Sequence, residues 1–407
     1  MRLGFFSTEY FRKHPGMAES DRELCKEFAR IGYHVRAVVE DRSVPRGEVW
    51  VDWDGPVKVW RYHVGRFHPL SLRKYTDKLL KGIIGAPRLA SLAGIYGRFL
   101  RENGDLDLLQ VEAPFPEGTL AAIIARRAHK PFIVSSRGWA STEFPWARRR
   151  AIQWTLRQAT GVRPNAVNMS RLVVERFGVD PGRVRVIRTN LSREAYPPPG
   201  LDLQTFRHQS RATVKARTGL SHRFLLVAAA RFVPMKGLEH LVAAVRILQD
   251  RDISVGVVLC GDGILREQLE AQVTELDLTK HVVFGGSVPH VEMRTFLGAS
   301  DLFVNPALLD WTPRVAVEAA VVGTPSILTT AVGCAAWMQE AGAGQAVPAA
   351  DAEALADAIT GWLEDATGWA DASRSAVAWA ETFKVERVAQ QMSQFHRDIA
   401  AEYRRNH

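Results

Sequence analysis

Residues 224–238 read FLLVAAARFVPMKGL, an apolar run followed by two cations that flank a proline-containing turn. The run over 224–230 has the length and bounded apolar character of a buried strand, and helical periodicity begins again over 237–250. We therefore expect Arg231 and Lys236 to lie where a strand's carboxyl end meets a helix N-terminus, the edge at which open α/β sheets bind ligands. Two cations beside helix N–H groups suit a diphosphate, and the alternative is a solvated turn with two unrelated charges.

The rest of the chain repeats this alternation of apolar runs and helical patterns, which is typical of parallel α/β folds. In the first half we expect a helix over 18–31 and strands at 3–7, 33–39, 106–111, 132–135 and 183–187. In the second half we expect strands at 255–260, 282–284, 302–304 and 326–328, separated by helices over 263–275, 291–299 and 314–322. The pattern predicts an α/β protein with two Rossmann-like halves.

The predicted boundary lies at three consecutive prolines, residues 197–199, because these cannot continue a helix or a central strand. The 407 residues allow two domains with cores of their own. We expect an N-terminal domain over 1–196, a linker over 197–205 and a C-terminal domain over 206–380. The last segment, 381–407, is expected to be a polar helix that caps its own domain or packs back on the first.

Composition excludes several classes of protein. With 46% hydrophobic and 24% charged residues the chain is globular rather than disordered, and it lacks a run of about 18 uninterrupted apolar residues that would suit a spanning helix. The N-terminal apolar stretch is too short for a signal peptide. Three widely separated cysteines, Cys25, Cys260 and Cys334, favour the cytoplasm and argue against a structural zinc site.

The net charge of +9 is unevenly distributed, because residues 1–200 are strongly basic and the remainder is acidic. An anionic partner for the first half is one explanation, and a solvated basic face is the other. Residues 73–101 and 144–150 mix Arg and Lys with apolar side chains, which suits peripheral contact with an anionic membrane on its inner face or a charged surface over a packed core. A basic nucleic-acid-binding protein is the non-enzyme alternative, although no RRM, KH or zinc signature is present.

Two further segments follow predicted strands in the second half. Gly261 and Gly263 come directly after the strand ending at 260, where glycines permit the backbone to approach a ligand closely. Val288 follows the next strand. Either segment could equally be a plain strand–turn–helix junction.

A pair of acids follows the strand at 302–304. Asp310 falls in a loop and Glu318 within the helix expected next, and carboxylates accept hydrogen bonds from vicinal hydroxyls, so the pair suits a polyhydroxylated ligand. Pro313 and Arg314 begin that helix and leave N–H groups free for phosphate. Burying Glu318 in its apolar stretch would be costly without a partner or ligand, and a half-exposed glutamate is the alternative.

Taken in order, these segments resemble the donor domain of glycosyltransferase family 4, the retaining enzymes of GT-B fold. The resemblance is carried by Arg231, Lys236-Gly237, Gly261-Asp262-Gly263, Phe284-Gly285, Val288, Ser300–Pro306, Asp310, Glu318-Ala319 and Gly323-Thr324-Pro325. It implies GT-B architecture, with two Rossmann-like parallel-sheet domains facing across a cleft. The second domain would bind a nucleotide-diphosphate sugar, and the first would bind the acceptor.

The resemblance also implies individual roles. Arg231 and Lys236 would hold the donor diphosphate, Glu318 would take the ribose hydroxyls, and Asp310 would touch the transferred sugar; these four are the catalytic candidates. The backbone near Val288 would face the base. The other donor-side candidates in this half are Gly261, Gly263, Pro313, Arg314 and Val315.

The first half resembles the family more loosely. Gly16 lies where the family has a Gly-Gly loop near the donor phosphates. Arg137 and Gly138 follow the predicted strand at the position of the family's cleft residues, and Glu112 is assigned to the same acceptor side. The histidine that relatives often carry there is absent, and we expect His14 to be a solvated loop residue.

Two departures from the family pattern lie where the sugar would bind. Asp310 stands where the family usually has glutamate, and Thr312-Pro313 replaces Phe-Gly. Because of these two departures, the resemblance does not identify the donor sugar.

We therefore expect a retaining, metal-independent hexosyltransferase of glycan biosynthesis that needs no cofactor. Its co-substrate would be a nucleotide-diphosphate sugar, and its acceptor a hydroxyl of a glycan, a glycolipid, a lipid-linked intermediate or a small glycoside. The DxD sequences at 52–54, in a turn-rich stretch, and 105–107 are interpreted as structural, because two cations already suit the diphosphate. The alternatives are a nucleotide-sugar epimerase or hydrolase on the same scaffold, and a dinucleotide oxidoreductase, for which GxGxxG is missing after the first strand.

Overall fold

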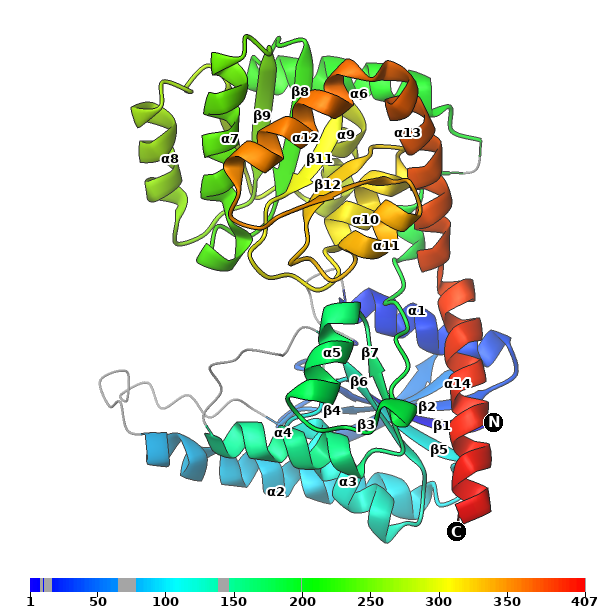
Figure 1. Ribbon diagram of the computed structural model, residues 1–407. Coiled ribbons are helices and arrows are strands. Elements are labelled where there is room, and N and C mark those ends of the chain that lie inside the picture. The colour runs from blue at the N-terminus through cyan, green and yellow to red at the C-terminus, as the bar shows by residue number, and fades with distance from the viewer. Residues whose placement is uncertain (8–9, 11–16, 65–77, 138–145, 199, 407) are drawn as a thin grey trace. The chain divides into compact units, whose positions relative to one another are not determined.

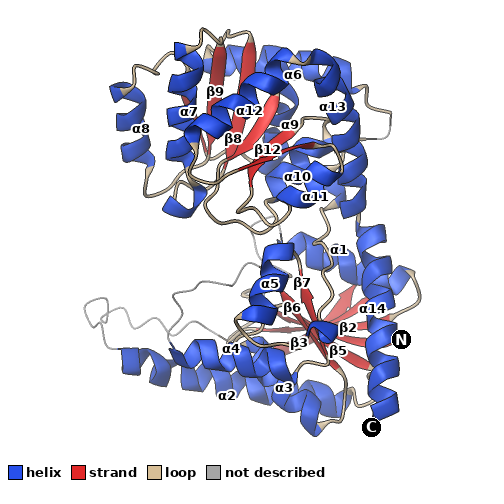
Figure 2. Cartoon of the chain, viewed as in Figure 1, coloured by secondary structure: helices blue, strands red, loops and turns tan. Residues whose placement is uncertain are grey.

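The computed structural model describes residues 1–407 except 8–9, 11–16, 65–77, 138–145, 199 and 407 (Figure 1). The chain forms two compact units, Met1–Asn190 with Val385–His407, and Leu191–Lys384. Each unit consists of a mainly or wholly parallel sheet with helices packed against it, as the colouring by secondary structure shows (Figure 2). The predicted fold class, two parallel-sheet α/β domains, is confirmed.

The first unit is built on a seven-stranded sheet of order β3-β4-β2-β1-β5-β6-β7. Its strands are β1 (Arg2–Ser7), β2 (His34–Glu40), β3 (Val49–Asp54), β4 (Val57–Tyr62), β5 (Leu108–Val111), β6 (Phe132–Ser136) and β7 (Gly161–Pro164). Its helices are α1 (Met17–Arg30), α2 (Lys78–Glu102), α3 (Glu117–Arg127), α4 (Trp146–Gln158), α5 (Val167–Glu175) and α14 (Val385–Asn406), with a 3-10 turn at Pro181–Arg183. All neighbouring strands run parallel except β3, which is antiparallel to β4 at the edge.

The core of this unit joins segments from both ends of the chain. Apolar side chains of α14, among them Met392 and Phe395, share one buried cluster with Leu3 of β1 and Phe28 of α1. The segment 381–407 is therefore shared between the two units. Its helix α14 packs on the first unit, whereas the 3-10 turn Glu381–Phe383 belongs to the second.

Two expectations for this unit are wrong. Residues 183–187 are not a strand: the N–H groups of Arg185 and Ile187 bond to β7, but only Val184 forms a bridge, so no ladder develops. The DxD at 52–54 lies in strand β3 rather than in a turn. Strands β3, β4 and β7 were not anticipated, because Trp, Asp, Arg and Pro interrupt their apolar pattern.

The second unit is built on a six-stranded, all-parallel sheet of order β10-β9-β8-β11-β12-β13. Its strands are β8 (Phe224–Ala229), β9 (Val255–Cys260), β10 (Val282–Gly286), β11 (Leu302–Asn305), β12 (Ser326–Thr329) and β13 (Gly344–Val347). Its helices are α6 (Leu203–Thr218), α7 (Leu238–Asp250), α8 (Arg266–Glu275), α9 (His290–Ala299), α10 (Arg314–Val321), α11 (Ala335–Glu340), α12 (Ala352–Glu364) and α13 (Ala366–Ala380), with 3-10 turns at Arg193–Ala195 and Pro234–Lys236. Apolar clusters cover both faces of the sheet.

The second unit begins before the prolines that we expected to mark the boundary. Leu191 and Ala195 are buried in its core, and the Tyr196 hydroxyl donates to the carbonyl of Ala380 (2.9 Å). These contacts hold the segment to the second unit. Across the described residues, no helix is both long enough and apolar enough to cross a bilayer.

Candidate functional site

The candidate residues of the second unit gather at the carboxyl edge of its sheet. Strand β8 lies at the centre, between β9 and β11, and the strand order reverses there. In doubly wound folds this switch point opens a crevice at the carboxyl ends of the strands, where ligands bind. The loop after β8 carries Arg231 and Lys236, and the loop after β11 carries Asp310.

Lys236 and Asp310 form an ion pair across this switch point. Lys236 Nζ donates to Asp310 Oδ2 at 2.5 Å, and the two side chains are 15% and 14% exposed. Asn305 Nδ2 also donates to Oδ2 (3.4 Å), and the N–H of Trp311 donates to Oδ1 (2.9 Å). The predicted cation and the predicted sugar-binding acid are therefore brought together, in direct contact with each other.

Glycine at 237 allows the loop that carries Lys236 to come this close. Gly237 has φ +58°, in the left-handed region, and a Cβ there would overlap the carbonyl oxygen of Pro306 in the loop after β11. Gly237 thus fixes the spacing of the two loops.

Glu318 lies one turn into α10 with its carboxylate buried. Its side chain is 9% exposed, and among the described residues it accepts no hydrogen bond. His290 Nδ1 and Arg314 Nη2 lie 3.7 and 3.9 Å from Oε1, which is too far for hydrogen bonds. Burial raises the pKa of Glu318 above its ordinary value, whereas the positive charges of His290, Arg314 and Arg294 lower it. A buried carboxylate in this state is suited to hydroxyl donors from a ligand.

Two further cations stand at the same edge. Arg231 is exposed and makes no hydrogen bond or ion pair with the described residues. In Arg314, Nε and Nη2 are buried and lack a hydrogen-bond partner within the described chain. Pro313 and Arg314 begin α10, and no side chain caps that N-terminus, so the N–H groups of Arg314 and Val315 face outward from the helix start.

The glycine candidates after β9, Gly261 and Gly263, lie against the loop that follows β8. A Cβ on Gly261 would overlap the carbonyl oxygen of Ala230, and one on Gly263 would overlap that of Phe232. The two loops are also joined by hydrogen bonds, from the N–H of Ala230 to Cys260 O and from the N–H of Phe232 to Asp262 O. These glycines therefore let the loop after β9 pack against the loop that carries Arg231.

Sequence reasoning found Val288 but missed its neighbour His290. Val288 is half-buried, packs against the core and lies between β10 and α9. His290 begins α9 and contacts Glu318. Its position directly after Val288-Pro289 was the available signal, but a histidine that starts a helix has no motif of its own.

In the first unit, Arg137 and Glu112 also lie at the carboxyl edge of the sheet, but they bind each other. Arg137 Nη1 pairs with Asp21 Oδ1 and Nη2 with Glu112 Oε2, both at 2.7 Å, and all three side chains are at most 3% exposed. Arg163 lies 3.6 Å from Glu112, and burial lowers its pKa to about 10. These groups form a buried network of ion pairs. Gly16, Gly138 and His14 lie outside the described residues.

The four DxD aspartates bind arginines and a lysine. Asp54 accepts from Arg22 and Lys26, and Asp52 pairs with Arg61. Asp105 and Asp107 pair with Arg36 and Arg2, respectively. Among the described residues, no group of three or more His, Cys, Asp or Glu side chains is arranged to hold a metal ion.

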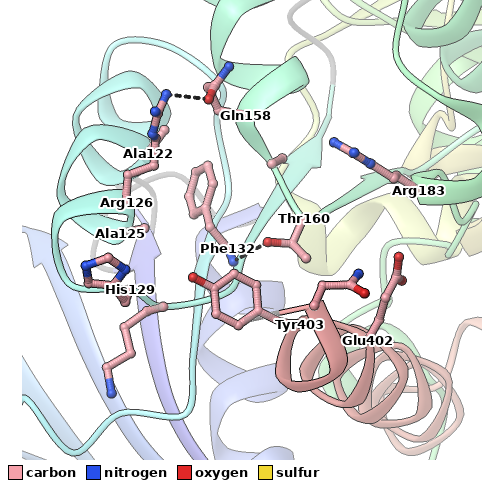
Figure 3. Close-up of a pocket in the computed structure, with 13 residues that line it drawn as sticks. Ala122, Ala125, Arg126, His129, Phe132, Gln158, Thr160, Arg183, Glu402 and Tyr403 are labelled. Carbon is pink, nitrogen blue, oxygen red and sulfur yellow. Dashed lines mark hydrogen bonds between the residues drawn. The ribbon is translucent and has the colours of Figure 1, made fainter.

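A separate cavity of about 490 Å³ lies at the opposite, amino-terminal edge of the first sheet (Figure 3). Phe132 and Thr160, at the starts of β6 and β7, form part of its lining, and Arg126 donates to Gln158 Oε1 across one wall (2.7 Å). Of its basic side chains, Arg126 lies in the last turn of α3, where the helix dipole favours a cation, and His129 and Lys130 follow that helix. Among the predicted site residues that the structure describes, none lines this cavity.

Comparisons with known proteins agree with this architecture. The family model "Glycosyl transferases group 1" matches residues 210–379, and "Glycosyl transferase 4-like domain" matches residues 16–190. Two parallel sheets of Rossmann order, each covered by helices, are the architecture of GT-B enzymes. The chain belongs to the GT-B glycosyltransferases that these two family models describe. The epimerase, hydrolase and nucleic-acid-binding alternatives are not favoured.

The curated relatives that the chain matches include two named glycosyltransferases. The chain is 24% identical to the GDP-mannose-dependent α-(1-6)-phosphatidylinositol monomannoside mannosyltransferase of Mycolicibacterium smegmatis, over 68% of this chain and 72% of that one. It is 27% identical to the D-inositol 3-phosphate glycosyltransferase of Corynebacterium glutamicum, over 63% of this chain and 61% of that one. The chain thus spans about three fifths of the length of several curated relatives that it matches.

The fold itself is shared over almost the whole chain. Sucrose-phosphate synthase of Thermosynechococcus elongatus superposes with a TM-score of 0.74 at 21% identity, covering 98% of this chain and 99% of that one. Anabaena HepE in complex with UDP gives a TM-score of 0.69 at 20% identity, covering 97% and 99%.

Proposed function

We propose that this protein is a retaining glycosyltransferase that moves a sugar from a nucleotide-diphosphate sugar to a hydroxyl acceptor. The observation that carries the proposal is Glu318, a buried carboxylate without a hydrogen bond to the described residues, on the helix whose uncapped N-terminus lies at the switch point. Its two oxygens suit the vicinal hydroxyls of a ribose. Lys236, Arg231 and the N–H groups at the start of α10 suit the adjoining diphosphate.

Charge stabilisation is the core of the proposed mechanism. As the glycosidic bond breaks, negative charge grows on the leaving diphosphate and the sugar becomes oxocarbenium-like. Lys236, Arg231 and the α10 N–H groups are assigned to that charge, where preorganised donors contribute most. The proposal assigns no side-chain nucleophile. Attack occurs on the same face from which the diphosphate leaves, and a donor phosphate oxygen takes the proton of the acceptor hydroxyl, so the anomeric configuration is retained.

The donor is the co-substrate, and the proposal needs neither a cofactor nor a metal. HepE was solved with UDP and with UDP-glucose, and the mycobacterial relative is named for GDP-mannose, so ribonucleoside diphosphate sugars are the donor class that we propose. The same names suggest an acceptor hydroxyl on a glycan, a glycolipid or a phosphorylated polyol. Asp310, Thr312 and Pro313 differ from the family pattern at the sugar, and they leave its identity to experiment.

Peripheral contact with an anionic membrane, on its cytoplasmic face, is proposed for the first unit. Trp146 and Trp154 on α4 are 73% and 36% exposed, and Arg150 lies between them on the same helical face. Exposed tryptophans beside arginines suit an anionic interface. Sedimentation with phosphatidylglycerol vesicles, compared with phosphatidylcholine vesicles, tests this: the double variant Trp146→Ser/Trp154→Ser should lose binding, and equal sedimentation of both proteins would contradict it.

The donor site is tested by calorimetric binding of UDP-, GDP-, ADP- and TDP-sugars without added metal. Selective binding of one nucleotide is expected, and Lys236→Ala should weaken it at least about tenfold, or about 1.4 kcal/mol. Lys280→Ala, which removes an exposed lysine of the same unit, is the matched control. No binding across the panel would contradict the proposal. With donor and acceptor identified, the anomeric configuration of the product, read by NMR, tests retention.

A further inference from the structure

In the proposed donor site, Lys236 already forms an ion pair with Asp310 of the same chain. Lys236 Nζ lies 2.5 Å from Asp310 Oδ2, and both side chains are largely removed from water. A phosphate oxygen that bound Lys236 would have to compete with this carboxylate. Arg231 differs, because it is exposed and makes no ion pair with the described residues.

Asp310 is held in this position by its backbone as well as its side chain. It forms a bridge with Val332, and the N–H of Gly333 donates to its carbonyl oxygen (3.0 Å). The lysine side of the pair is set by the close approach of Gly237 to Pro306. The pair therefore joins two loops whose backbones are fixed, rather than two mobile surface side chains.

We propose that Asp310 is a specificity-determining residue that makes the site favour the intact nucleotide-diphosphate sugar over the bare nucleoside diphosphate. This inference rests on the proposed function. When the donor binds, the Lys236 ammonium moves from Asp310 to a phosphate oxygen. Asp310 Oδ2 then accepts a hydrogen bond from a hydroxyl of the sugar instead. A bare nucleoside diphosphate offers no such hydroxyl, so its phosphate displaces Asp310 without replacing the contact that Asp310 loses.

The same exchange favours product release. Once the sugar has been transferred, no sugar hydroxyl donates to Asp310, and its carboxylate competes with the diphosphate for Lys236. Like-charge repulsion between Asp310 and the phosphate acts in the same direction. Asp310 thus acts on the diphosphate through Lys236, and its removal should strengthen product binding, which is the opposite of what structural damage would do.

The experiment measures binding of the nucleoside diphosphate and of the matching sugar donor, both chosen from the panel above, by calorimetry. Asp310→Asn is expected to bind the nucleoside diphosphate about tenfold more tightly than the wild type, since close desolvated charge pairs have couplings of this size or larger. The sugar donor should gain less, because it loses its contact with the carboxylate. Asp310→Glu keeps the charge and should stay within about twofold of the wild type.

Two controls separate this exchange from simpler effects. Asp357→Asn removes the same charge from an exposed ion pair with Arg251 in the same unit, and should leave nucleotide affinity unchanged. In a Lys236→Met background, Asp310→Asn should change the affinity for the nucleoside diphosphate much less, because the ammonium for which Asp310 and the phosphate compete is absent. In steady-state kinetics, Asp310→Asn should show stronger product inhibition together with a lower kcat.

The outcomes distinguish this inference from the proposed function. If Lys236→Met weakens nucleotide binding but Asp310→Asn weakens it too or leaves it unchanged, the inference is overturned and the donor site stands. If Asp357→Asn tightens binding as much as Asp310→Asn does, the effect is one of net charge and the inference is again overturned. If no nucleotide binds any of the variants, both fail.

Discussion

The two sheets of this protein carry charged side chains along the same edge, but they use them differently. In the first unit, Arg137, Asp21 and Glu112 pair with one another and are almost completely buried. In the second unit, Glu318 is also largely buried, at 9% exposure, but it accepts no hydrogen bond from the described residues. Arg231 is exposed and has no ion pair among them.

The difference shows why a charged residue at a sheet's carboxyl edge is insufficient to identify a binding site. Buried charges that satisfy each other act in stability, because removing one leaves the others unpaired. A buried carboxylate that the protein leaves without hydrogen bonds costs stability and is retained where a ligand can supply them. We therefore expect mutations in the first network to affect unfolding, and mutations in the second site to affect binding and turnover.

The largest expected effect is that of Arg137→Met. It leaves Asp21 and Glu112 buried without their shared partner, and such losses cost about 3–5 kcal/mol. Urea unfolding of the full chain should show this loss, whereas Arg126→Met, at an exposed position of α3, should change stability little. A loss below about 1 kcal/mol for Arg137→Met would mean that the network is not a unit of stability.

Lys236→Ala should affect turnover more than stability. Removing a donor that stabilises the leaving diphosphate is expected to lower kcat about 10²–10³-fold. The thermal midpoint should fall less than in Arg137→Met, because Lys236 and Asp310 are less deeply buried and Asp310 keeps its hydrogen bonds from Asn305 and Trp311. A large fall in the thermal midpoint with turnover intact would place Lys236 with the stabilising charges instead.

His396 makes the first unit sensitive to acid. It is buried, its Nε2 hydrogen-bonds to Gln110 Oε1 (2.7 Å), and burial, with the charges of Arg163 and Arg397, lowers its pKa to about 3. Between about pH 6.5 and 3 the unfolded chain binds a proton that the folded chain does not, so stability falls as the pH falls, by at most about 1.4 kcal/mol per pH unit. His396→Gln should flatten urea-unfolding profiles in this window, and an unchanged slope would contradict the assignment.

Glu318→Gln should separate stability from binding. Burial raises the pKa of Glu318, so folding favours the protonated carboxyl over the carboxylate. The ionised form therefore lowers the stability of the fold, and this loss disappears as the pH falls through the raised pKa. Glutamine removes the cost, and the thermal midpoint at neutral pH should rise. Donor binding should weaken about tenfold, and the wild type's donor affinity should fall as the pH drops toward 4.5. Calorimetry on both proteins at two pH values tests this; tighter donor binding by Glu318→Gln would exclude the ribose role.

Sequence reasoning was more successful for the second unit than for the first. The predicted strands from 224–230 to 326–328 are all present, because each is a short apolar run bounded by Gly, Pro or Asp, as buried parallel strands require. The first sheet ends in β3 and β4, whose Trp, Asp and Arg residues serve an antiparallel edge and therefore lack that pattern. Residues 183–187 have the apolar alternation of a strand, but they form only one β-bridge with β7, at Val184, although the N–H groups of Arg185 and Ile187 also bond to that strand.

For the site, local patterns were sufficient to place Arg231, Lys236, Asp310 and Glu318 after their strands, since the carboxyl ends of parallel strands share one edge. Which of these groups meet depends on strand order and on backbone contacts between distant loops, such as that of Gly237 with Pro306. The pairing of Lys236 with Asp310, the contact of His290 with Glu318 and the closure of Arg137 on Glu112 all join residues far apart in the chain. Such contacts are set by the packing of the folded chain, and no short stretch of residues encodes them.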